Sequence, residues 1–414
     1  MQKANTVGHV ASLDVLRGLA VIGTLLTNIW IFAPAGWDSY EIKGEALTGL
    51  FSETWQTRIA DISTMVSNGK FLSLLSILFG VGMAIQFESA LRRGHRWPWR
   101  YEWRSLLLLA DGFLHFALVF EFDILMGYAL VAMVVAPLLR LRTRWLVAAT
   151  ALAGAFHLVM EYRSVLSTQD HSARELPPDA STTGDRVPLP EPVSYVDEVA
   201  NRLGDFWNLR SEAFVIAPPL SAFLFLTGVL LWRAGLFTAD ARARRLSVWL
   251  AAGGLGAGVP LTVWPALGLP GGDVLVTLSR YTVAPVVAFG YLGLVLVLLR
   301  RGGGTGFLGR RFAAVGRTAL SCYMLQNVLA MAAFNSWGLR LGPLDSVGTV
   351  LAWAVISGIL MLAASLWLRR FPQGPFELVW RAAVEAPFRR RDRGRAEEAA
   401  AGRERARKEH VDVP

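Results

Sequence analysis

The sequence predicts an all-α membrane protein, a bundle of about ten transmembrane helices. Two observations lead to this fold class: 53% of the 414 residues are hydrophobic, and the apolar residues form runs of about 20, the length that crosses a bilayer. A third observation is that arginine gathers in the short segments between these runs. The expected spans are 13–33, 70–91, 104–120, 123–139, 144–161, 214–233, 246–266, 281–299, 312–334 and 347–368.

The arginines assign the sides of the membrane. Clusters of arginine follow the second, fourth, sixth and eighth spans, whereas the segments between the third and fourth and between the ninth and tenth spans carry few. Positively charged loops remain in the cytoplasm. Both termini are therefore expected to be cytoplasmic, and the long segments 34–69 and 162–213 are expected on the outer side.

One membrane domain is expected over residues 1–385, followed by a charged cytoplasmic tail at 386–414. Within the domain, 162–213 combines prolines with Ser, Thr and Asp, a composition that buries little surface and is typical of an insertion; a lid is the alternative. The net charge of +9 marks topology and does not predict nucleic-acid binding. No metal is expected, because no His, Cys and carboxylate set has metal-ligand spacing.

The first span carries a polar stripe. Arg17, Val21, Thr24 and Asn28 follow one another at helical spacing, so Asn28 returns to within about 20° of Arg17 around the helix. Polar groups are costly in lipid and are expected to face protein or a water-filled cavity. Thr24 is therefore expected to line a substrate cavity.

The third span provides a candidate catalytic base. His115 follows Asp111 by one helical turn, and Glu121 and Asp123 come at the end of the span. A carboxylate that holds a histidine fixes its tautomer and stabilises the imidazolium, an arrangement suited to taking a proton from a hydroxyl or an amine. The alternative is a histidine that only joins helices. An ionisable cluster at membrane depth favours the functional interpretation.

Arg17 and Arg317 are both expected near cytoplasmic helix ends. Two arginines there suit the phosphates of a cytosolic anionic cofactor, which they would hold by charge-assisted hydrogen bonds. Alternatively, both extend to the membrane interface or pair with Asp14.

The ninth span continues with three polar side chains on one face. Tyr323, Gln326 and Asn327 are three and four residues apart, so they share one side of a helix. They are expected to line the substrate cavity, or alternatively to bond neighbouring helices.

Taken together, an ordered set of motifs resembles the YeiB family of bacterial inner-membrane proteins, also described as domain of unknown function 418. The motifs are Leu13-Asp14-Val15-Leu16-Arg17-Gly18 with Asn28, Lys70-Phe71 before Leu78-Phe79-Gly80-Val81-Gly82, Gly112-Phe113-Leu114-His115 before Asp123-Ile124-Leu125, Gly316-Arg317-Thr318-Ala319-Leu320 with Tyr323 and Gln326, and Gln373-Gly374-Pro375-Phe376-Glu377 with Trp380-Arg381. The resemblance implies a multi-pass protein of the bacterial cytoplasmic membrane.

The first-helix motif is also distantly similar to that of transmembrane acyltransferases such as heparan-alpha-glucosaminide N-acetyltransferase. Those enzymes move an acetyl group from cytosolic acetyl-CoA to an acceptor across the membrane. The resemblance implies that Asn28 stabilises a developing oxyanion or orients the acceptor. The acetyltransferases carry a histidine eleven residues beyond that asparagine, where this chain has Ser39. His115, assisted by Asp111 or Asp123, is therefore the expected base.

The sequence thus predicts a membrane acyltransferase that uses acyl-CoA or acetyl-CoA bound near Arg17 and Arg317. Its expected partners are the lipid bilayer and a small-molecule or glycan acceptor on the outer side, with no nucleic acid; a homodimer is one option for its assembly. Two alternatives remain: a transporter of an anionic or amphipathic solute, and a non-catalytic membrane scaffold.

Overall fold

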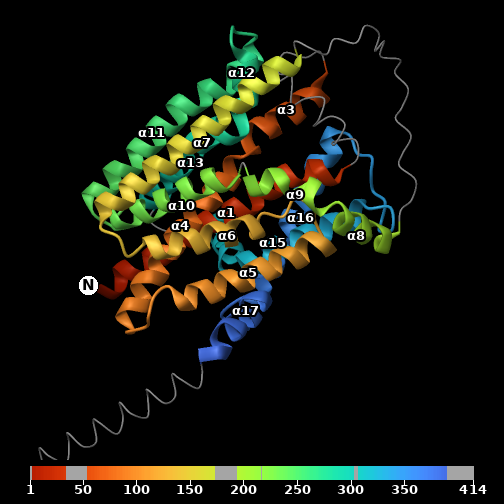
Figure 1. Ribbon diagram of the computed structural model, residues 1–414. Helices are drawn as coiled ribbons and strands as arrows, with labels where there is room; N and C mark the ends of the chain where they lie inside the picture. Colours follow the sequence, from red (N-terminus) through yellow and green to blue (C-terminus); the bar gives the residue numbers. More distant parts are fainter. Residues whose placement is uncertain (1, 34–53, 173–193, 216, 303–305, 389–414) are drawn as a thin grey trace, which may run out of the picture.

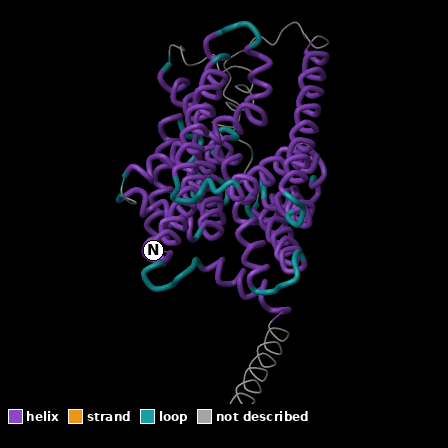
Figure 2. The backbone as a smooth tube through the Cα atoms, turned by 90° about the vertical axis from the view of Figure 1, so that its left-hand side faces the viewer, coloured by secondary structure: helices purple, strands orange, loops and turns teal. Residues whose placement is uncertain are grey.

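A computed structural model describes residues 2–33, 54–172, 194–215, 217–302 and 306–388 (Figure 1). Within these residues all regular structure is helical (Figure 2). The helices are α1 (Gln2–Phe32), α3 (Trp55–Ser67), α4 (Lys70–Arg92), α5 (Trp99–Leu118), α6 (Leu125–Leu138), α7 (Thr143–Ser172), α8 (Tyr195–Gly204), α9 (Phe206–Val215), α10 (Ala217–Arg233), α11 (Ala241–Val263), α12 (Gly272–Leu278), α13 (Ala284–Arg301), α14 (Phe307–Arg317), α15 (Ala319–Phe334), α16 (Ser346–Trp367) and α17 (Pro375–Glu385). Short turns of other helix types are η2 (Pro265–Leu267), η3 (Ser279–Val283) and η4 (Ala386–Phe388).

Several helices are long and apolar enough to cross a membrane. In the described residues these are Ala11–Phe32, Trp55–Arg92, Thr143–Leu166, Ala241–Val263, Val274–Arg301 and Ser346–Trp367. Three shorter apolar helices accompany them: Leu125–Leu138, Ala217–Arg233 and Ala319–Phe334. The chain is therefore a multi-pass helical membrane protein, and every expected span overlaps a helix.

Burial separates the central helix from the outer ones. In α1, 67% of the apolar segment is buried inside the protein. The corresponding share is 22% in α7 and α11 and 28% in α16. Exposed leucine and valine side chains cover α7 and α16, and α7 also has exposed aromatic side chains, as a surface that faces lipid tails requires. α1 lies in the middle of the bundle (Figure 1), in contact with α3, α4, α14, α15 and α16.

The middle of α1 touches α14 through backbone atoms. A Cβ atom added at Gly18 would collide with the carbonyl oxygen of Phe312, and one added at Gly316 would collide with the carbonyl oxygen of Asp14. The two helices therefore approach more closely than any larger residue at these positions permits, as in other membrane helix pairs joined by small residues.

The expected ninth span, 312–334, is two helices instead of one. The helix breaks at Thr318, whose backbone has φ −118° and ψ 37°. A tertiary contact explains the break: one carboxylate oxygen of Glu377 in α17 accepts the backbone N–H groups of Leu320 and Ser321, at 2.8 and 3.2 Å. The other oxygen bonds the Ser321 hydroxyl. α17 thus caps the N-terminus of α15, which supplies partners for amide groups that a new helix start leaves unbonded.

The arginine-rich turns meet at one end of the bundle. Arg233, at the end of α10, donates to the carbonyl oxygens of Leu139 and Leu141 in the α6–α7 turn, at 2.6 and 3.2 Å. Arg300, at the end of α13, donates to the carbonyl oxygen of Leu236 in the α10–α11 turn at 2.7 Å. These arginines therefore join neighbouring turns as well as marking one side of the bundle.

The second half of the expected insertion packs on the bundle. Residues 194–215 form α8 and α9, and Glu198 of α8 accepts hydrogen bonds from Asn335 Nδ2 and Trp337 Nε1 at 2.8 and 3.1 Å. In this part α8 has no buried residue, as expected for 162–213, whereas Arg210 of α9 is an exception that is only 2% exposed. Residues 173–193, Ser39 and the tail from 389 lie outside the described residues.

Candidate functional site

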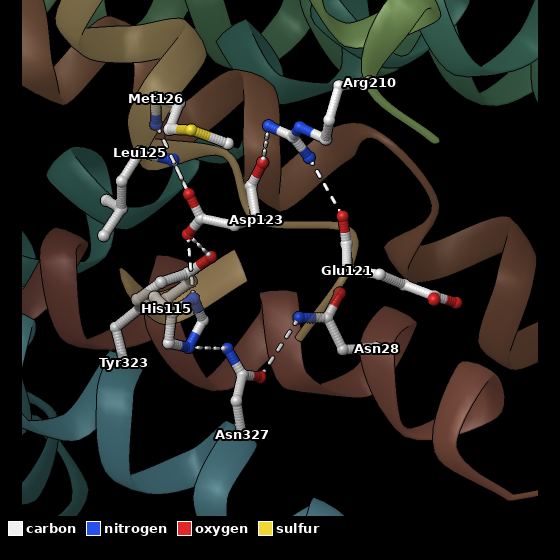
Figure 3. A network of polar contacts seen from close by, with 9 residues as sticks. All are labelled: Asn28, His115, Glu121, Asp123, Leu125, Met126, Arg210, Tyr323 and Asn327. Carbon is white, nitrogen blue, oxygen red and sulfur yellow. Dashed lines mark hydrogen bonds and ion pairs between the residues drawn. The ribbon is translucent and has the colours of Figure 1, made fainter. Parts of the chain in front are cut away.

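A buried polar network joins α1, α5, α15 and the α5–α6 turn (Figure 3). Nδ1 of His115 lies 2.9 Å from Oδ2 of Asp123, and Nε2 of the same ring lies 3.2 Å from Nδ2 of Asn327. Asn28 Nδ2 donates to Asn327 Oδ1 at 3.5 Å. The structure therefore brings together Asn28, His115, Asp123 and Asn327, which come from three segments far apart in the sequence.

The contacts of Asp123 define the donors and acceptors of the network. Its Oδ1 atom accepts the backbone N–H groups of Leu125 and Met126, at 2.8 and 3.3 Å. Its Oδ2 atom faces His115 and accepts the Tyr323 hydroxyl at 3.5 Å. With Asn327 Nδ2 donating to Nε2, an ionised Asp123 and a neutral His115 protonated on Nδ1 satisfy every contact. The Nε2 lone pair is then the proton acceptor, and the Asn327 amide occupies it.

The network is almost closed to solvent. His115, Asp123 and Asn327 are 3%, 1% and 0% exposed. An ion pair or proton transfer in such a place interacts more strongly than in water, because the surrounding dielectric is low. Any reacting group must therefore enter by displacing one of the present neighbours.

Local packing explains how Asp123 comes so close to His115. A Cβ atom added at Gly112 would lie 2.6 Å from the backbone nitrogen of Met126, so glycine at this position allows α6 to start against α5. Arg210 of α9 donates to the carbonyl oxygens of Glu121 and Asp123, at 3.0 and 2.6 Å. The turn is thus fixed from both sides, and Arg210 is a contributor that sequence reasoning missed.

Three other sequence candidates lie outside this network. Asp111, one helical turn before His115, has a buried Oδ2 atom without a hydrogen-bond partner; Asp123 holds the imidazole instead. Thr24 donates its hydroxyl to the carbonyl oxygen of Ala20 at 2.8 Å, which satisfies it within its own helix. Gln326 is fully buried, and neither its side-chain oxygen nor its nitrogen has a partner.

A cavity of about 530 Å³ opens between α1, α4, α5, α15 and α17. Four arginines line it, and we call it the arginine cavity: Arg17, Arg104, Arg317 and Arg381, together with Gln86, Tyr101, Tyr323 and Trp380. Of the predicted substrate-cavity residues, Tyr323 lines it, whereas Thr24, Gln326 and Asn327 are absent from its described walls. Tyr323 also connects the cavity to the network, because its ring centroid lies 5.3 Å from that of His115.

The four arginines of the cavity differ in whether a carboxylate already pairs with the guanidinium group. Arg17 Nη1 lies 3.6 Å from Asp14 Oδ1, the pairing that the sequence left open, and Arg381 pairs with Glu385 at 2.8 Å. Arg317 donates to a main-chain oxygen, that of Pro372, at 3.1 Å. The guanidinium of Arg104 lies 5.9 Å from the Trp380 ring centroid. Arg104 and Arg317 are thus the two whose described contacts include no carboxylate ion pair.

Arg104 is the last arginine of the cluster that follows the second expected span, and it begins the third. Its position repeats the polar stripe of the first span: Arg104, Leu108, Asp111 and His115 follow at the same intervals as Arg17, Val21, Thr24 and Asn28. In both helices the arginine lines the arginine cavity and the polar residue eleven positions later belongs to the network. This repeated spacing is the sequence signal that would have identified Arg104.

A second cavity, of about 170 Å³, lies at the opposite end of α4. Its walls include Ser73 and Ser76 of early α4, Asp123 of the α5–α6 turn and Arg210. Tyr128 lines both cavities, and its hydroxyl is hydrogen-bonded to Ser76 Oγ at 2.5 Å. Tyr128 therefore lies between the two spaces, with Tyr323 in the wall of the first and Asp123 in the wall of the second.

Fold and site together define a multi-pass helical membrane protein with a buried histidine–carboxylate pair beside an arginine-lined cavity. A family model described as protein of unknown function (DUF418) matches residues 231–386. The chain is 27% identical over 409 residues to the uncharacterized protein YxaH of Bacillus subtilis, which covers 93% of this chain and 96% of that protein. It is 28% identical over 410 residues to the uncharacterized protein YeiB of Escherichia coli, and the match covers 89% of this chain and 94% of that protein. The resemblance to the YeiB (DUF418) family is confirmed.

Proposed function

We propose that this protein is a membrane acyltransferase that takes an acyl group from acyl-CoA or acetyl-CoA in the arginine cavity. One observation carries the proposal: a buried His115, held on Nδ1 by Asp123, lies one aromatic ring away from a cavity lined by four arginines. Arginine is suited to phosphate groups because its planar fork forms two parallel charge-assisted hydrogen bonds. The cavity leads from these cations to Tyr323, where the acyl end of the donor would lie.

In the proposed reaction His115 is the general base. Nε2 takes the proton of an acceptor hydroxyl or amine while the acceptor atom attacks the thioester carbonyl carbon and the C–S bond breaks. The imidazolium then returns the proton to the departing thiolate, so protons and electrons balance. Asp123 remains ionised throughout and stabilises the imidazolium. The acceptor must displace the Asn327 amide from Nε2, and the amides of Asn28 and Asn327 are the nearest donors for the developing oxyanion.

The arrangement in the membrane is part of the proposal. The chain would cross the bacterial cytoplasmic membrane about ten times, with both termini and the arginine cavity on the cytoplasmic side and the acceptor, a small molecule or glycan, on the outer side. The meeting of arginine-rich turns at one end of the bundle supports this orientation. Single cysteines at Ala239 and Asn201 in a Cys322→Ser background test it. Impermeant reagent should label position 201 but not 239 in intact cells, and the reverse pattern would invert the orientation.

Donor binding tests the function directly. Calorimetry with acetyl-CoA should show binding to the detergent-purified protein, and Arg104→Gln and Arg317→Gln should each weaken it by about 1.5–3 kcal/mol, about 10- to 150-fold. Arg369→Gln, an exposed arginine outside the cavity, is the matched control and should bind as the wild type does. A wild-type protein that binds neither acetyl-CoA nor CoA would contradict the proposal.

The two cavities also fit a transporter, the second candidate function. Two cavities at opposite ends of α4, with polar side chains such as Tyr128 between them, are an arrangement expected of a carrier. A transporter would move an anionic solute into liposomes at a rate that does not depend on acyl-CoA. Acyl transfer to a detergent-soluble acceptor without solute uptake would favour the enzyme.

A further inference from the structure

The second cavity contains a buried cation that the proposed reaction does not use. Arg210 is 2% exposed, and its Nη1 and Nη2 atoms donate to main-chain carbonyl oxygens. Its Nε atom is buried and has no hydrogen-bond partner. The guanidinium lies 5.4 and 5.6 Å from the ring centroids of Phe116 and Phe214. Several of its five N–H donors therefore remain for a ligand.

Cationic side chains outnumber carboxylates among the described residues that line this cavity. Arg210 and Arg280 both line it, whereas Asp123 is the one carboxylate among its described lining residues. Both carboxylate oxygens of Asp123 already have partners: Oδ2 contacts His115, and Oδ1 accepts the backbone N–H groups of Leu125 and Met126. A guanidinium does not lose its proton in a protein, so the cost of burying this charge persists until an anion offsets it.

Burial also makes the charge of Arg210 less favourable than it is in water. Desolvation lowers the pKa of Arg210, and the nearby charge of Asp123 only partly opposes this. A lowered pKa means that the charged form is less favourable here than in water. A bound anion would reverse that effect, which is the electrostatic condition for an anion site.

The size and the other walls of the cavity limit the ligand. A volume of about 170 Å³ is close to that of an engineered cavity of about 150 Å³ that holds one benzene molecule. About six non-hydrogen atoms therefore fit. Ser73, Ser76 and Ser221 line the same space. The Ser76 hydroxyl already bonds Leu72 and Tyr128, which leaves Ser73 and Ser221 as the serines whose hydroxyls could donate to a carboxylate or a phosphate.

We infer that the second cavity is a binding site for a small oxyanion, a carboxylate or phosphate monoester of about six heavy atoms, held by Arg210 and Arg280. The site is separate from the arginine cavity and does not depend on acyl transfer. Its ligand lies near the main-chain carbonyl of Asp123, which Arg210 contacts, whereas the acyl donor would lie in the arginine cavity. Arg210 then has two tasks, since it fixes the α5–α6 turn and contacts the anion.

The test is calorimetry on the full-length protein in detergent with ethyl phosphate, propionate and uncharged propanol. Ethyl phosphate and propionate should bind and propanol should not. Arg210→Gln should weaken anion binding by about tenfold or more, the effect of losing a charge-assisted contact. Arg202→Gln is the matched control: this α8 arginine pairs with Glu198 at 3.4 Å and is absent from the cavity's described walls.

Two further variants separate this site from the arginine cavity and from misfolding. Ser221→Met fills the second cavity without removing a charge and should abolish the binding, whereas Arg104→Gln should leave it unchanged. Binding that survives Ser221→Met, or that is lost in Arg104→Gln, would assign the anion to the arginine cavity and overturn the inference. Equal affinity for propanol, or no binding of either anion at millimolar concentration, would overturn it as well. If Arg210→Gln fails to fold, the Ser221→Met result decides.

Discussion

The carboxylate of Asp123 holds the imidazole of His115 at 2.9 Å with one oxygen while the other oxygen caps the start of α6. The same side chain therefore orients the candidate base and fixes the helix that follows it. Both functions need an acceptor, because His115 Nδ1–H and the backbone N–H of Leu125 are both donors. Only a carboxylate offers two acceptor oxygens in this geometry.

Asp123→Asn is expected to destabilise the protein by about 1–3 kcal/mol, since its amide nitrogen must face one of the two donors and leave it unpaired. Denaturation of the detergent-purified protein measures this. Asp345→Asn is the matched control, because Asp345 Oδ1 caps α16 through a single contact, Gly348 N at 2.7 Å. Asparagine caps a helix about as well as aspartate. Equal, small effects at the two positions would show that Asp123 does not serve both donors.

Two glycines test the backbone contact between α1 and α14. Gly18→Ala should cost about 1–3 kcal/mol, the range for overpacking a tight contact, because its methyl group would collide with the Phe312 carbonyl. Gly256→Ala in α11 meets nothing within 4 Å and should be neutral or stabilise by up to about 1 kcal/mol, since alanine favours helix. Unfolding midpoints in one detergent compare them. A tolerated Gly18→Ala would mean that α1 and α14 are less closely packed.

Hydropathy predicted the helices well because the bilayer imposes both length and composition. It failed at Thr318, where the apolar run continues but the helix does not. The break depends on Glu377, a residue far along the chain that caps the new helix start. No local pattern contains that information. The short helices α8 and α9 were missed for a related reason, since proline and polar residues nearby concealed them.

The candidate site was predicted in composition but not in pairing. Helical periodicity associates His115 with Asp111, one turn away, whereas the chain reversal after α5 brings Asp123 to the ring. Asn28 and Asn327 were both selected as polar residues in apolar spans, yet their contact joins helices distant in sequence. The sequence did not identify Arg210 as a buried site residue, because an arginine in a polar segment is usually exposed to solvent.

Glu121 gives a pH-dependent test of the α5–α6 turn. Desolvation raises its pKa, opposed by the charge of Arg202 and assisted by that of Glu198. Because the folded state resists ionisation, Glu121 lowers stability as the pH rises above the ordinary carboxyl pKa, and this cost is absent below it.

Glu121→Gln should therefore raise the unfolding midpoint at neutral pH and have little effect at a pH below the ordinary carboxyl pKa. Thermal unfolding at several pH values gives the comparison. Glu385→Gln, which alters an exposed pair with Arg381, should show a small change without this trend. A Glu121→Gln protein whose midpoint is lower than wild type at neutral pH would reverse the sign of the argument.

His115→Gln separates catalysis from helix packing. If His115 is the base, the variant should bind acetyl-CoA as wild type does and lose acyl transfer by about 10²- to 10⁴-fold, the usual contribution of general-base catalysis. If it only joins helices, glutamine replaces much of its hydrogen bonding, and turnover should persist with at most a modest loss of stability. Transfer of radiolabel from acetyl-CoA to outer-side acceptors, together with calorimetry, measures both quantities.

His157→Gln is the matched control for that experiment. His157 is also buried within a membrane helix, where its Nε2 atom lies 2.9 Å from the carbonyl oxygen of Tyr281, and it has no place in the network around Asp123. Its replacement should leave acyl transfer near the wild-type rate. Near wild-type transfer by His115→Gln would remove His115 as the base. Equal losses in both variants with weakened acetyl-CoA binding would attribute the effect to the fold, because a base is needed for the chemical step and not for binding the donor.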